Sequence, residues 1–176
     1  MQPVSLEVWK QKMDNLNARR VSNPGVKPCN TQIGDYKSNI NKVKIGSSLL
    51  DVGCGGMPVK AVLPDTVKYV GIDPFPIKEG VVNMAIEDCT FEDNSFDTVI
   101  CFACLDGTID PSKAIQQMKR VCKNNVLLLT GIDIEPDKYH THKITMEFLM
   151  EQFIDFKLGY KEVLHPKVFL IEFLKP

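Results

Sequence analysis

The 176-residue sequence contains no apolar run that approaches the roughly 20 residues of a membrane-spanning helix. It also lacks an excess of charge of either sign, because 21 Lys and Arg stand against 22 Asp and Glu, for a formal net charge of −1. A near-neutral chain has no overall basic field, so we do not expect a nucleic acid as partner. The first residues, MQPVSLEVWK, show no apolar signal segment, and we therefore expect a cytoplasmic protein.

The sequence lacks a cysteine arrangement that would bind zinc. Its six cysteines include one C-x-x-C pair, Cys101 and Cys104, and no second ligand pair accompanies it. A thioredoxin-like pair would open a helix after a strand, whereas this pair lies within or at the end of an apolar run. We therefore interpret the cysteines as free structural thiols in a reducing compartment, and we predict no metal centre.

Two nucleotide-binding fingerprints are also missing. The segment LLDVGCGG (49–56) runs from an apolar stretch into an acid and a glycine cluster, but the dinucleotide pattern G-x-G-x-x-G would require glycine where Pro58 stands. No Gly-Lys-Ser/Thr follows to complete a P-loop. A nicotinamide oxidoreductase is therefore disfavoured. The glycine turn still allows positive φ and lets the backbone approach a nucleotide-like ligand closely.

From residue 44 onward, apolar runs alternate with amphipathic segments, which predicts an α/β fold with a mostly parallel sheet covered on both faces. We expect reduced helices after the first two strands, because Pro64 and the segment PFPIKEG interrupt them. The last two runs flank Pro166 and predict an antiparallel hairpin. The expected strands are 47–52, 67–73, 80–88, 95–105, 125–131, 160–165 and 167–174, and the expected helices are 111–123 and 144–153.

Residues 5–20 have the spacing of an amphipathic helix. The following segment, SNPGVKPCN, breaks this pattern with two prolines and a glycine. We therefore divide the chain into an N-terminal helical arm, residues 1–30, and one main domain, residues 31–176. The arm packs on the main domain or acts as a lid over its site. Its apolar face comprises Leu6, Trp9, Met13 and Leu16.

A second functional signal lies at the end of the expected strand 67–73, where Asp73 stands 20 residues after Gly53. An acid at this position can accept hydrogen bonds from both hydroxyls of a ribose. Because parallel strands end at the same edge of a sheet, we expect the glycine turn and Asp73 to lie close together. The pair predicts a site for a ligand that contains a nucleoside.

Three stretches together resemble the class I S-adenosylmethionine-dependent methyltransferases, in particular the small type 11 methyltransferase domains: LLDVGCGG, YVGIDP and IEDCTFEDNSFDTVICFACL. The resemblance runs from about Leu49 to Gly131 and more weakly to the C-terminus. It implies a single-domain, Rossmann-like sandwich whose mostly parallel seven-stranded sheet ends in a C-terminal antiparallel hairpin. It also implies an enzyme that uses S-adenosylmethionine and releases S-adenosylhomocysteine.

The resemblance assigns residues to the methionine end of this cofactor. Asp51 and the backbone of Gly53, Cys54 and Gly55 would hold the methionine group. Phe102, at the end of the fourth strand, would line the pocket around the sulfonium.

The resemblance also assigns residues to the adenosine end. Asp73, followed by Pro74, would bind the ribose hydroxyls. Ile86 would give its backbone N–H to the adenine ring.

Two positions depart from the family's pattern. The acid that often contacts the adenine amino group falls on Ala85, so Glu87 or Asp88 would have to replace it. The family's Leu-x-His after the fourth strand reads Leu105-Asp106-Gly107 here, which leaves Asp106 as the nearest ionisable group.

Transfer of a methyl group needs a general base only if the acceptor keeps its proton at neutral pH, as a hydroxyl does. The segment YHTHKIT (139–145) follows the fifth strand, and similar histidine-bearing loops occur in methyltransferases that act on sugars and other small hydroxyl compounds. We predict His140 or His142 as the base, with Asp106 as a third candidate. The alternatives are a solvated polar loop, or a metal site completed by Asp106 and other acids.

The sequence thus predicts a methyltransferase that acts on a small-molecule or carrier-linked acceptor, with the hydroxyl of a sugar-type compound as first choice. Since no inserted cap domain encloses a substrate, we expect an open site. The alternatives are a protein or nucleic-acid methyltransferase, and a catalytically inactive cofactor-binding partner subunit. We expect a monomer or a homodimer.

Overall fold

A computed structural model describes residues 1–22, 35–75 and 78–176 of the chain. Within these ranges, no helix is both long enough and apolar enough to cross a membrane. The strands are β1 (Ser48–Val52), β2 (Lys68–Asp73), β3 (Val82–Asn83), β4 (Phe96–Phe102), β5 (Cys122–Gly131), β6 (Lys157–His165) and β7 (Val168–Leu174).

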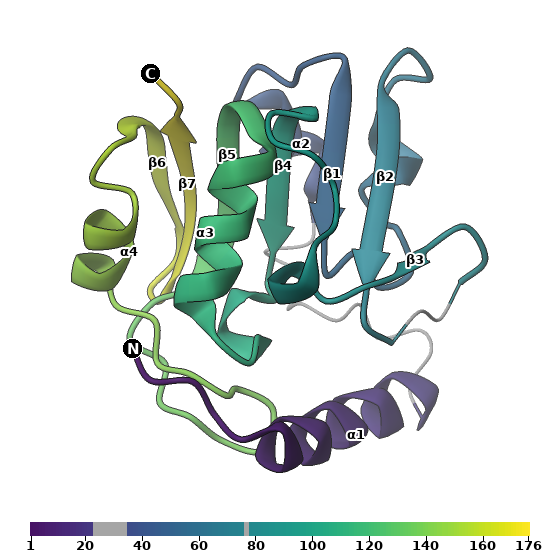
Figure 1. Ribbon diagram of the computed structural model, residues 1–176, viewed down its shortest axis with the longest axis vertical. Coiled ribbons are helices and arrows are strands. Elements are labelled where there is room, and N and C mark those ends of the chain that lie inside the picture. Colours follow the sequence, from purple (N-terminus) through teal and green to yellow (C-terminus); the bar gives the residue numbers. More distant parts are fainter. Residues whose placement is uncertain (23–34, 76–77) are drawn as a thin grey trace.

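These strands form one seven-stranded sheet in the order β3-β2-β1-β4-β5-β7-β6 (Figure 1). The pairs from β3 to β5 are parallel, whereas β7 pairs antiparallel with both β5 and β6. The chain leaves β1 toward β2 and later returns to β4 on the other side of β1. This reversal is a topological switch point, and ligands bind beyond the carboxyl ends of the strands at such points.

Helices cover both faces of the sheet (Figure 1). One face carries α3 and α4, and its core includes Leu50, Val99 and Leu128. The opposite face carries α2 and η1, and its core includes Leu49, Ile100 and Leu127. The elements are α2 (Tyr36–Asn41), α3 (Pro111–Val121), α4 (Met146–Gln152) and the 3₁₀ turns η1 (Lys60–Val62), η2 (Ile86–Asp88) and η3 (Leu105–Gly107).

The start of α3 follows from its local sequence. The side chain of Asp110 accepts hydrogen bonds from the backbone N–H groups of Ser112 and Lys113 and so caps the helix. Pro111 occupies the first helical position, where the missing N–H has no cost. The buried face of the helix then comprises Ala114, Ile115, Met118 and Val121.

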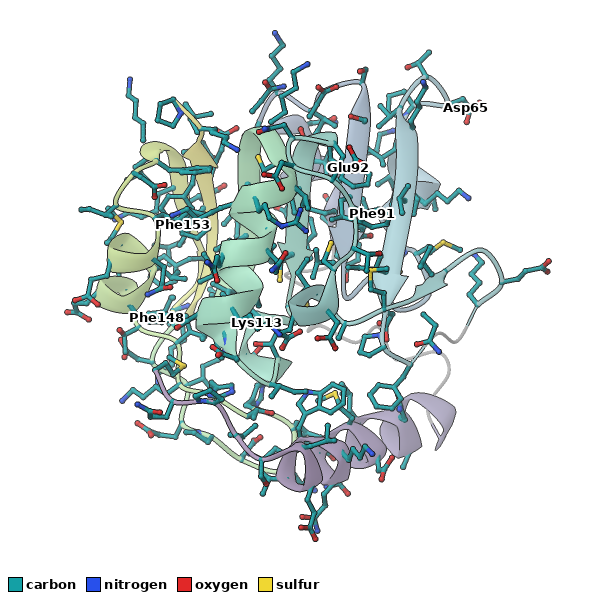
Figure 2. All side chains as sticks on the ribbon, in the orientation of Figure 1. Asp65, Phe91, Glu92, Lys113, Phe148 and Phe153 are labelled. Atoms are coloured by element: carbon teal, nitrogen blue, oxygen red, sulfur yellow. The ribbon has the colours of Figure 1, made fainter. Side chains whose placement is uncertain are left out.

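The second helix on this face, α4, is anchored by aromatic packing. Thr145 accepts a hydrogen bond from the backbone N–H of Phe148 at 3.1 Å and caps the helix. Phe153, which follows α4, stacks on Phe173 of β7 with 4.0 Å between the ring centroids. Figure 2 shows Phe148 and Phe153 beside α4.

The expected architecture is confirmed. The sheet has seven strands and ends in an antiparallel hairpin, and only the 3₁₀ turn η1 separates β1 from β2. Several details differ: β3 has only two residues, β5 begins at Cys122 within the helix expected over 111–123, β6 begins at Lys157, and α2 was not expected. Six residues carry too little periodicity to reveal a helix, although Asp35 caps α2 through the N–H of Ser38. The expected boundary at residue 30 lies outside the described residues.

The N-terminal arm forms α1 (Leu6–Ser22), which crosses the carboxyl edge of the sheet at the bottom of Figure 1. The indole N–H of Trp9 donates to the carbonyl oxygen of Gly107 at 2.8 Å. The ammonium group of Lys12 donates to the carbonyl oxygen of His140, also at 2.8 Å. The arm is therefore fixed to two loops that follow β4 and β5.

Candidate functional site

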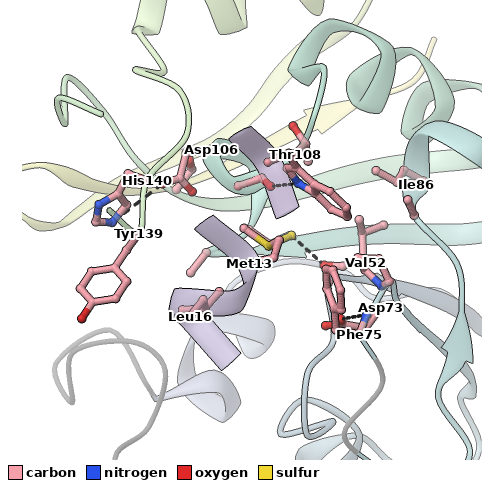
Figure 3. Close-up of a pocket in the computed structure, with 18 of the residues that line it drawn as sticks. Met13, Leu16, Val52, Asp73, Phe75, Ile86, Asp106, Thr108, Tyr139 and His140 are labelled. Carbon is pink, nitrogen blue, oxygen red and sulfur yellow. Dashed lines mark hydrogen bonds and ion pairs between the residues drawn. The ribbon is translucent and has the colours of Figure 1, made fainter. Parts of the chain in front are cut away.

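A cavity of about 330 Å³ lies between α1 and the carboxyl edge of the sheet. This volume is at the lower end of the roughly 300–1,000 Å³ of small-molecule sites. Met13 and Leu16 of α1 lie between its two ends in Figure 3. We call these ends the β2 end, with Asp73, Phe75 and Ile86, and the histidine end, with Asp106, Tyr139 and His140.

The glycine turn after β1 brings bare backbone to the cavity. Gly53 lines the cavity and has a φ of 68°, in the left-handed region. A Cβ atom added there would lie 2.5 Å from Sγ of Cys104. The N–H groups of Gly53 and Cys54 both donate to the carbonyl oxygen of Ile72, which joins the turn to β2. The turn is thus built around a position that only glycine fits.

We expect Gly53→Ala to lower the free energy of unfolding by about 2 kcal/mol, because the left-handed backbone is strained for alanine and Cys104 would have to move. Gly56→Ala is the matched control, since a Cβ atom added at Gly56 has no neighbour within 4 Å. Urea unfolding of the two variants measures the difference. Equal stability of the two variants would contradict this account of the turn.

Asp73 ends β2 and turns its carboxylate toward the cavity. Its Oδ2 accepts a hydrogen bond from the N–H of Gly55 at 3.0 Å, and its Oδ1 accepts one from the N–H of Phe75 at 2.8 Å. The residue is 4% exposed. The two hydrogen bonds, one to each carboxylate oxygen, fix the position of its side chain. Each carboxylate oxygen keeps lone-pair capacity for a further donor in the cavity. Pro74, the next predicted residue, also lines the cavity.

Ile86 and Glu87 begin η2 and line the cavity beside β2. The carboxylate of Glu87 accepts hydrogen bonds from the backbone N–H groups of Ile109 at 2.7 Å and Asp110 at 3.3 Å. Glu87 therefore holds the segment before α3 as well as facing the cavity. Asp88, the alternative to Glu87, is exposed and pairs with Lys113 at 3.5 Å.

Asp51 lies in β1 and is not among the described residues that line the cavity. Its side chain is 2% exposed, and its Oδ2 accepts a hydrogen bond from the hydroxyl of Tyr69 at 2.7 Å. Burial raises the pKa of Asp51 to about 7, the Tyr69 hydrogen bond lowers it in part, and the nearby Asp73 raises it further. A buried acid of this kind is costly to ionise, which points to a functional reason for keeping it.

Three other residues that were predicted to bind the cofactor also lie outside the described cavity lining. Cys54 and Gly55 are buried behind the turn, and Gly55 reaches the site only through its hydrogen bond to Asp73. Phe102 stacks on Tyr36 of α2 with 6.0 Å between the ring centroids, on the face of the sheet that α2 covers. Ala103, with a φ of 55°, redirects the chain after β4 and lines the cavity in place of Phe102.

At the histidine end, His140 stands between two carboxylates. Its Nδ1 lies 2.9 Å from Oδ1 of Asp137, and its Nε2 lies 3.9 Å from Oδ2 of Asp106. Asp137 also accepts the N–H groups of Tyr139 and His140, which fixes the turn. Because a carboxylate accepts hydrogen bonds, Nδ1 carries the hydrogen in the neutral ring and Nε2 is left as the basic atom.

His142 points away from the cavity and is 6% exposed. Its Nε2 lies 3.0 Å from the carbonyl oxygen of Thr108 and 3.2 Å from that of Ile109, so this nitrogen donates. Burial lowers the pKa of His142 and favours the neutral ring. His142 therefore ties its loop to the segment before α3, whereas His140 faces the site.

Residues 50–130 match a family model described as a methyltransferase domain. This range contains the glycine turn, Asp73, η2 and the end of β4, which together make up the β2 end of the cavity and part of its histidine end. The matched stretch is a methyltransferase domain, and its motifs are similar to those of the class I S-adenosylmethionine-dependent methyltransferases. Comparison with curated proteins yields no significant match for this methyltransferase.

Solved structures of low sequence identity share the fold of this methyltransferase. The 1,6-didemethyltoxoflavin-N1-methyltransferase of Burkholderia thailandensis, with bound 1,6-didemethyltoxoflavin and S-adenosylhomocysteine, has a TM-score of 0.75 at 10% identity, covering 99% of this chain and 92% of that chain. The [4+2]-cyclase SpnF has a TM-score of 0.75 at 16% identity, covering 99% and 98%. A SAM-dependent methyltransferase of Aquifex aeolicus has a TM-score of 0.61 at 14% identity, covering 96% and 98%.

The residues present fit S-adenosylmethionine, which is the cofactor of this methyltransferase. At the end of β2, the carboxylate of Asp73 is held by two backbone N–H groups, in a position where it would accept hydrogen bonds from ribose hydroxyls. The turn at Gly53 brings backbone without a side chain to the cavity wall, where it can approach a ligand closely. Phe75 and Ile86 supply apolar surface for the adenine ring at the same end of the cavity.

Sequence reasoning missed two residues at the methyltransferase site, and only the first of them carried a signal in the sequence. Asp137 stands three residues before His140, a spacing that is typical of a capped turn and could have been noticed. Phe75, which follows Pro74, lies 5.4 Å from the ring of Trp9, centroid to centroid. That contact joins the arm to β2 and has no local signal.

Proposed function

We propose that the methyltransferase transfers the methyl group of S-adenosylmethionine to a hydroxyl of a small-molecule acceptor, with His140 as the general base. The observation that carries this proposal is the orientation of His140, whose Nε2 is left basic at the cavity while Asp137 holds Nδ1. A hydroxyl keeps its proton at neutral pH, so a positioned base accelerates its methylation.

The chain's own contribution is positioning and the removal of one proton. The cofactor would supply an activated methyl group for attack by an aligned nucleophile, with S-adenosylhomocysteine as the leaving group. Asp73 and the Gly53 turn would fix the cofactor, and the walls of the cavity would exclude water. His140 would take the acceptor's proton at Nε2, and Asp137 would stabilise the resulting imidazolium through Nδ1.

We further propose that α1 is a lid. Trp9 and Met13 are each 7% exposed, and with Leu16 they line the cavity from the side opposite the sheet. This cover differs from the open site expected from the sequence. A cavity of about 330 Å³ that α1 partly covers supports a small acceptor over a large carrier-linked one.

The walls of the histidine end bear on the kind of hydroxyl compound. Leu129, Ile134 and Val168 offer apolar surface, and Thr130 and Tyr139 offer few polar groups. A sugar-type acceptor, our first choice from the sequence, would leave several hydroxyls without partners there. We therefore propose a hydroxyl on a compact, largely apolar or aromatic body, with sugars retained in the acceptor screen.

The proposal is tested by His140→Gln, with formation of S-adenosylhomocysteine as the readout across sugars, phenols and small alcohols. We expect kcat to fall about a hundredfold, because general base catalysis contributes roughly 10²–10⁴. Calorimetric binding of S-adenosylmethionine should not change. His165→Gln is the matched control, since His165 is exposed at the end of β6.

Three results would count against the proposal. An unchanged kcat in His140→Gln would show that His140 is not the general base. Tight cofactor binding without turnover on any acceptor would favour the alternative of an inactive partner subunit, which the missing acid at Ala85 and the missing histidine after Leu105 also support. Turnover only on a polypeptide or a nucleic acid would favour the macromolecular alternative.

A further inference from the structure

The cavity has an acidic lining. Three carboxylate residues line it, namely Asp73, Glu87 and Asp106. Among the described lining residues there is no Lys or Arg, and His140 is the one side chain that can become cationic. An anionic ligand would therefore meet carboxylates without a matching cation, at least on the described walls.

Two of these carboxylates already have hydrogen-bond donors. Asp73 accepts from the N–H groups of Gly55 and Phe75, and Glu87 accepts from those of Ile109 and Asp110. Backbone N–H groups stabilise a buried carboxylate without taking up all its lone pairs. The carboxylates of Asp73 and Glu87 are therefore stabilised by the protein even without a ligand.

Asp106 is different. Its backbone carbonyl oxygen accepts the N–H groups of Thr141 and His142. Its carboxylate interacts with its own backbone and lies near His140, His142 and Asp137, and among the described residues its ion-pair contact is with Nε2 of His140. That distance is 3.9 Å, which is too long for a hydrogen bond. The side chain is only 16% exposed. A carboxylate held in this way gains most from a donor that a ligand brings.

We propose that the histidine end selects neutral or cationic acceptors and rejects anionic ones, and that Asp106 is the residue that binds the acceptor's donor group. This inference rests on the proposed function, because it places the acceptor at the histidine end. It names the acceptor's chemistry more narrowly: a hydroxyl compound with a second donor, such as an ammonium or hydroxyl group. Phosphorylated acceptors and nucleotide-sugars are disfavoured.

The fold places Asp106 to perform this role. It lies in η3, directly after β4, and the Trp9 indole holds the neighbouring Gly107 carbonyl oxygen at 2.8 Å. Figure 3 shows Asp106 beside His140. An acceptor bound to Asp106 would therefore lie within the reach of His140, which allows one group to orient the molecule and the other to take the proton.

The experiment uses three phenols that share one acceptor hydroxyl and differ in the charge of the tail: tyramine, 2-(4-hydroxyphenyl)ethanol and 4-hydroxyphenylacetate. Each is titrated calorimetrically into the full chain saturated with S-adenosylhomocysteine. We expect affinity to fall in that order, with at least about a tenfold difference between the first and the last. Asp106→Asn should reduce this difference to less than about threefold.

Asp133→Asn is the matched control. Asp133 is an exposed acid in the loop after β5, so this substitution removes the same charge at a position that does not line the cavity. It should keep the order of the three phenols. Equal affinity for the three, preference for 4-hydroxyphenylacetate, an unchanged order in Asp106→Asn, or no binding at millimolar concentrations would each overturn the inference.

The titration also separates this inference from the function on which it rests. Binding of S-adenosylhomocysteine is measured first. If the cofactor product binds and the charge order fails, only the role of Asp106 is wrong. If it does not bind, the proposed function fails and the inference fails with it.

Discussion

Asp73→Ala is expected to weaken the binding of S-adenosylmethionine and S-adenosylhomocysteine by about a hundredfold. The ribose would lose two hydrogen bonds to a charged acceptor, each worth about 1.5–3 kcal/mol. The variant also leaves the N–H groups of Gly55 and Phe75 without the carboxylate that aligns them. Both effects act on the same end of the cavity, so the loss should concern the cofactor before the acceptor.

The measurement is calorimetric titration with both adenosyl ligands and with NADH. Asp88→Asn is the matched control, because Asp88 lies in the adjacent η2 but is exposed. Thermal unfolding of each variant checks that the turn still folds. Unchanged affinity in a folded Asp73→Ala protein would remove Asp73 from the site, and preferential binding of NADH would revive the oxidoreductase alternative.

Asp51→Asn is expected to stabilise the protein at alkaline pH by up to about 4 kcal/mol, since a pKa difference of one unit corresponds to about 1.4 kcal/mol. The pKa of Asp51 is raised from 3.8 to about 7 in the folded state. Between these values the native carboxyl keeps a proton that the unfolded chain releases, so this contribution to stability falls as pH rises from about 4 to 7. Asparagine keeps an oxygen for the Tyr69 hydroxyl and carries no charge to bury.

Urea unfolding of both proteins at about pH 4 and about pH 8 measures this effect. The two stabilities should agree at the lower pH and separate at the higher one. A stability difference that does not depend on pH would contradict the buried acid as its source. If Asp51 serves the methionine end of the cofactor, the stabilised variant should also gain less stability than the parent from added S-adenosylmethionine.

The fold was predictable from local patterns in the chain. The order of strands and helices follows from apolar runs, from caps such as Asp110 and Thr145, and from proline positions. Asp73 and the Gly53 turn could be placed together because parallel strands β1 and β2 must end at one edge. Each of these inferences depends only on neighbours in sequence and on a rule of sheet topology.

It was harder to predict from the sequence which side of the chain a site residue faces. In an extended segment, residues two positions apart point to the same side, so alternation along the chain could not show that only one of His140 and His142 faces the cavity. The hydrogen bonds to Asp137 and Thr108 decide that His140 faces the cavity and that His142 does not. Phe102 lies on the face of the sheet that α2 covers. The positive φ of Ala103 turns the chain there, so that Ala103 lines the cavity and Phe102 does not.

By itself the sequence determined the class I architecture, the glycine turn and the acid that ends β2, because these signals are local. The tertiary structure alone decided that α1 lies along the cavity and lines it. Trp9 and Gly107 are 98 residues apart, and Lys12 and His140 are 128 apart, yet each pair shares a hydrogen bond. Contacts over such separations depend on how the whole sheet folds, and no short stretch of residues contains that information.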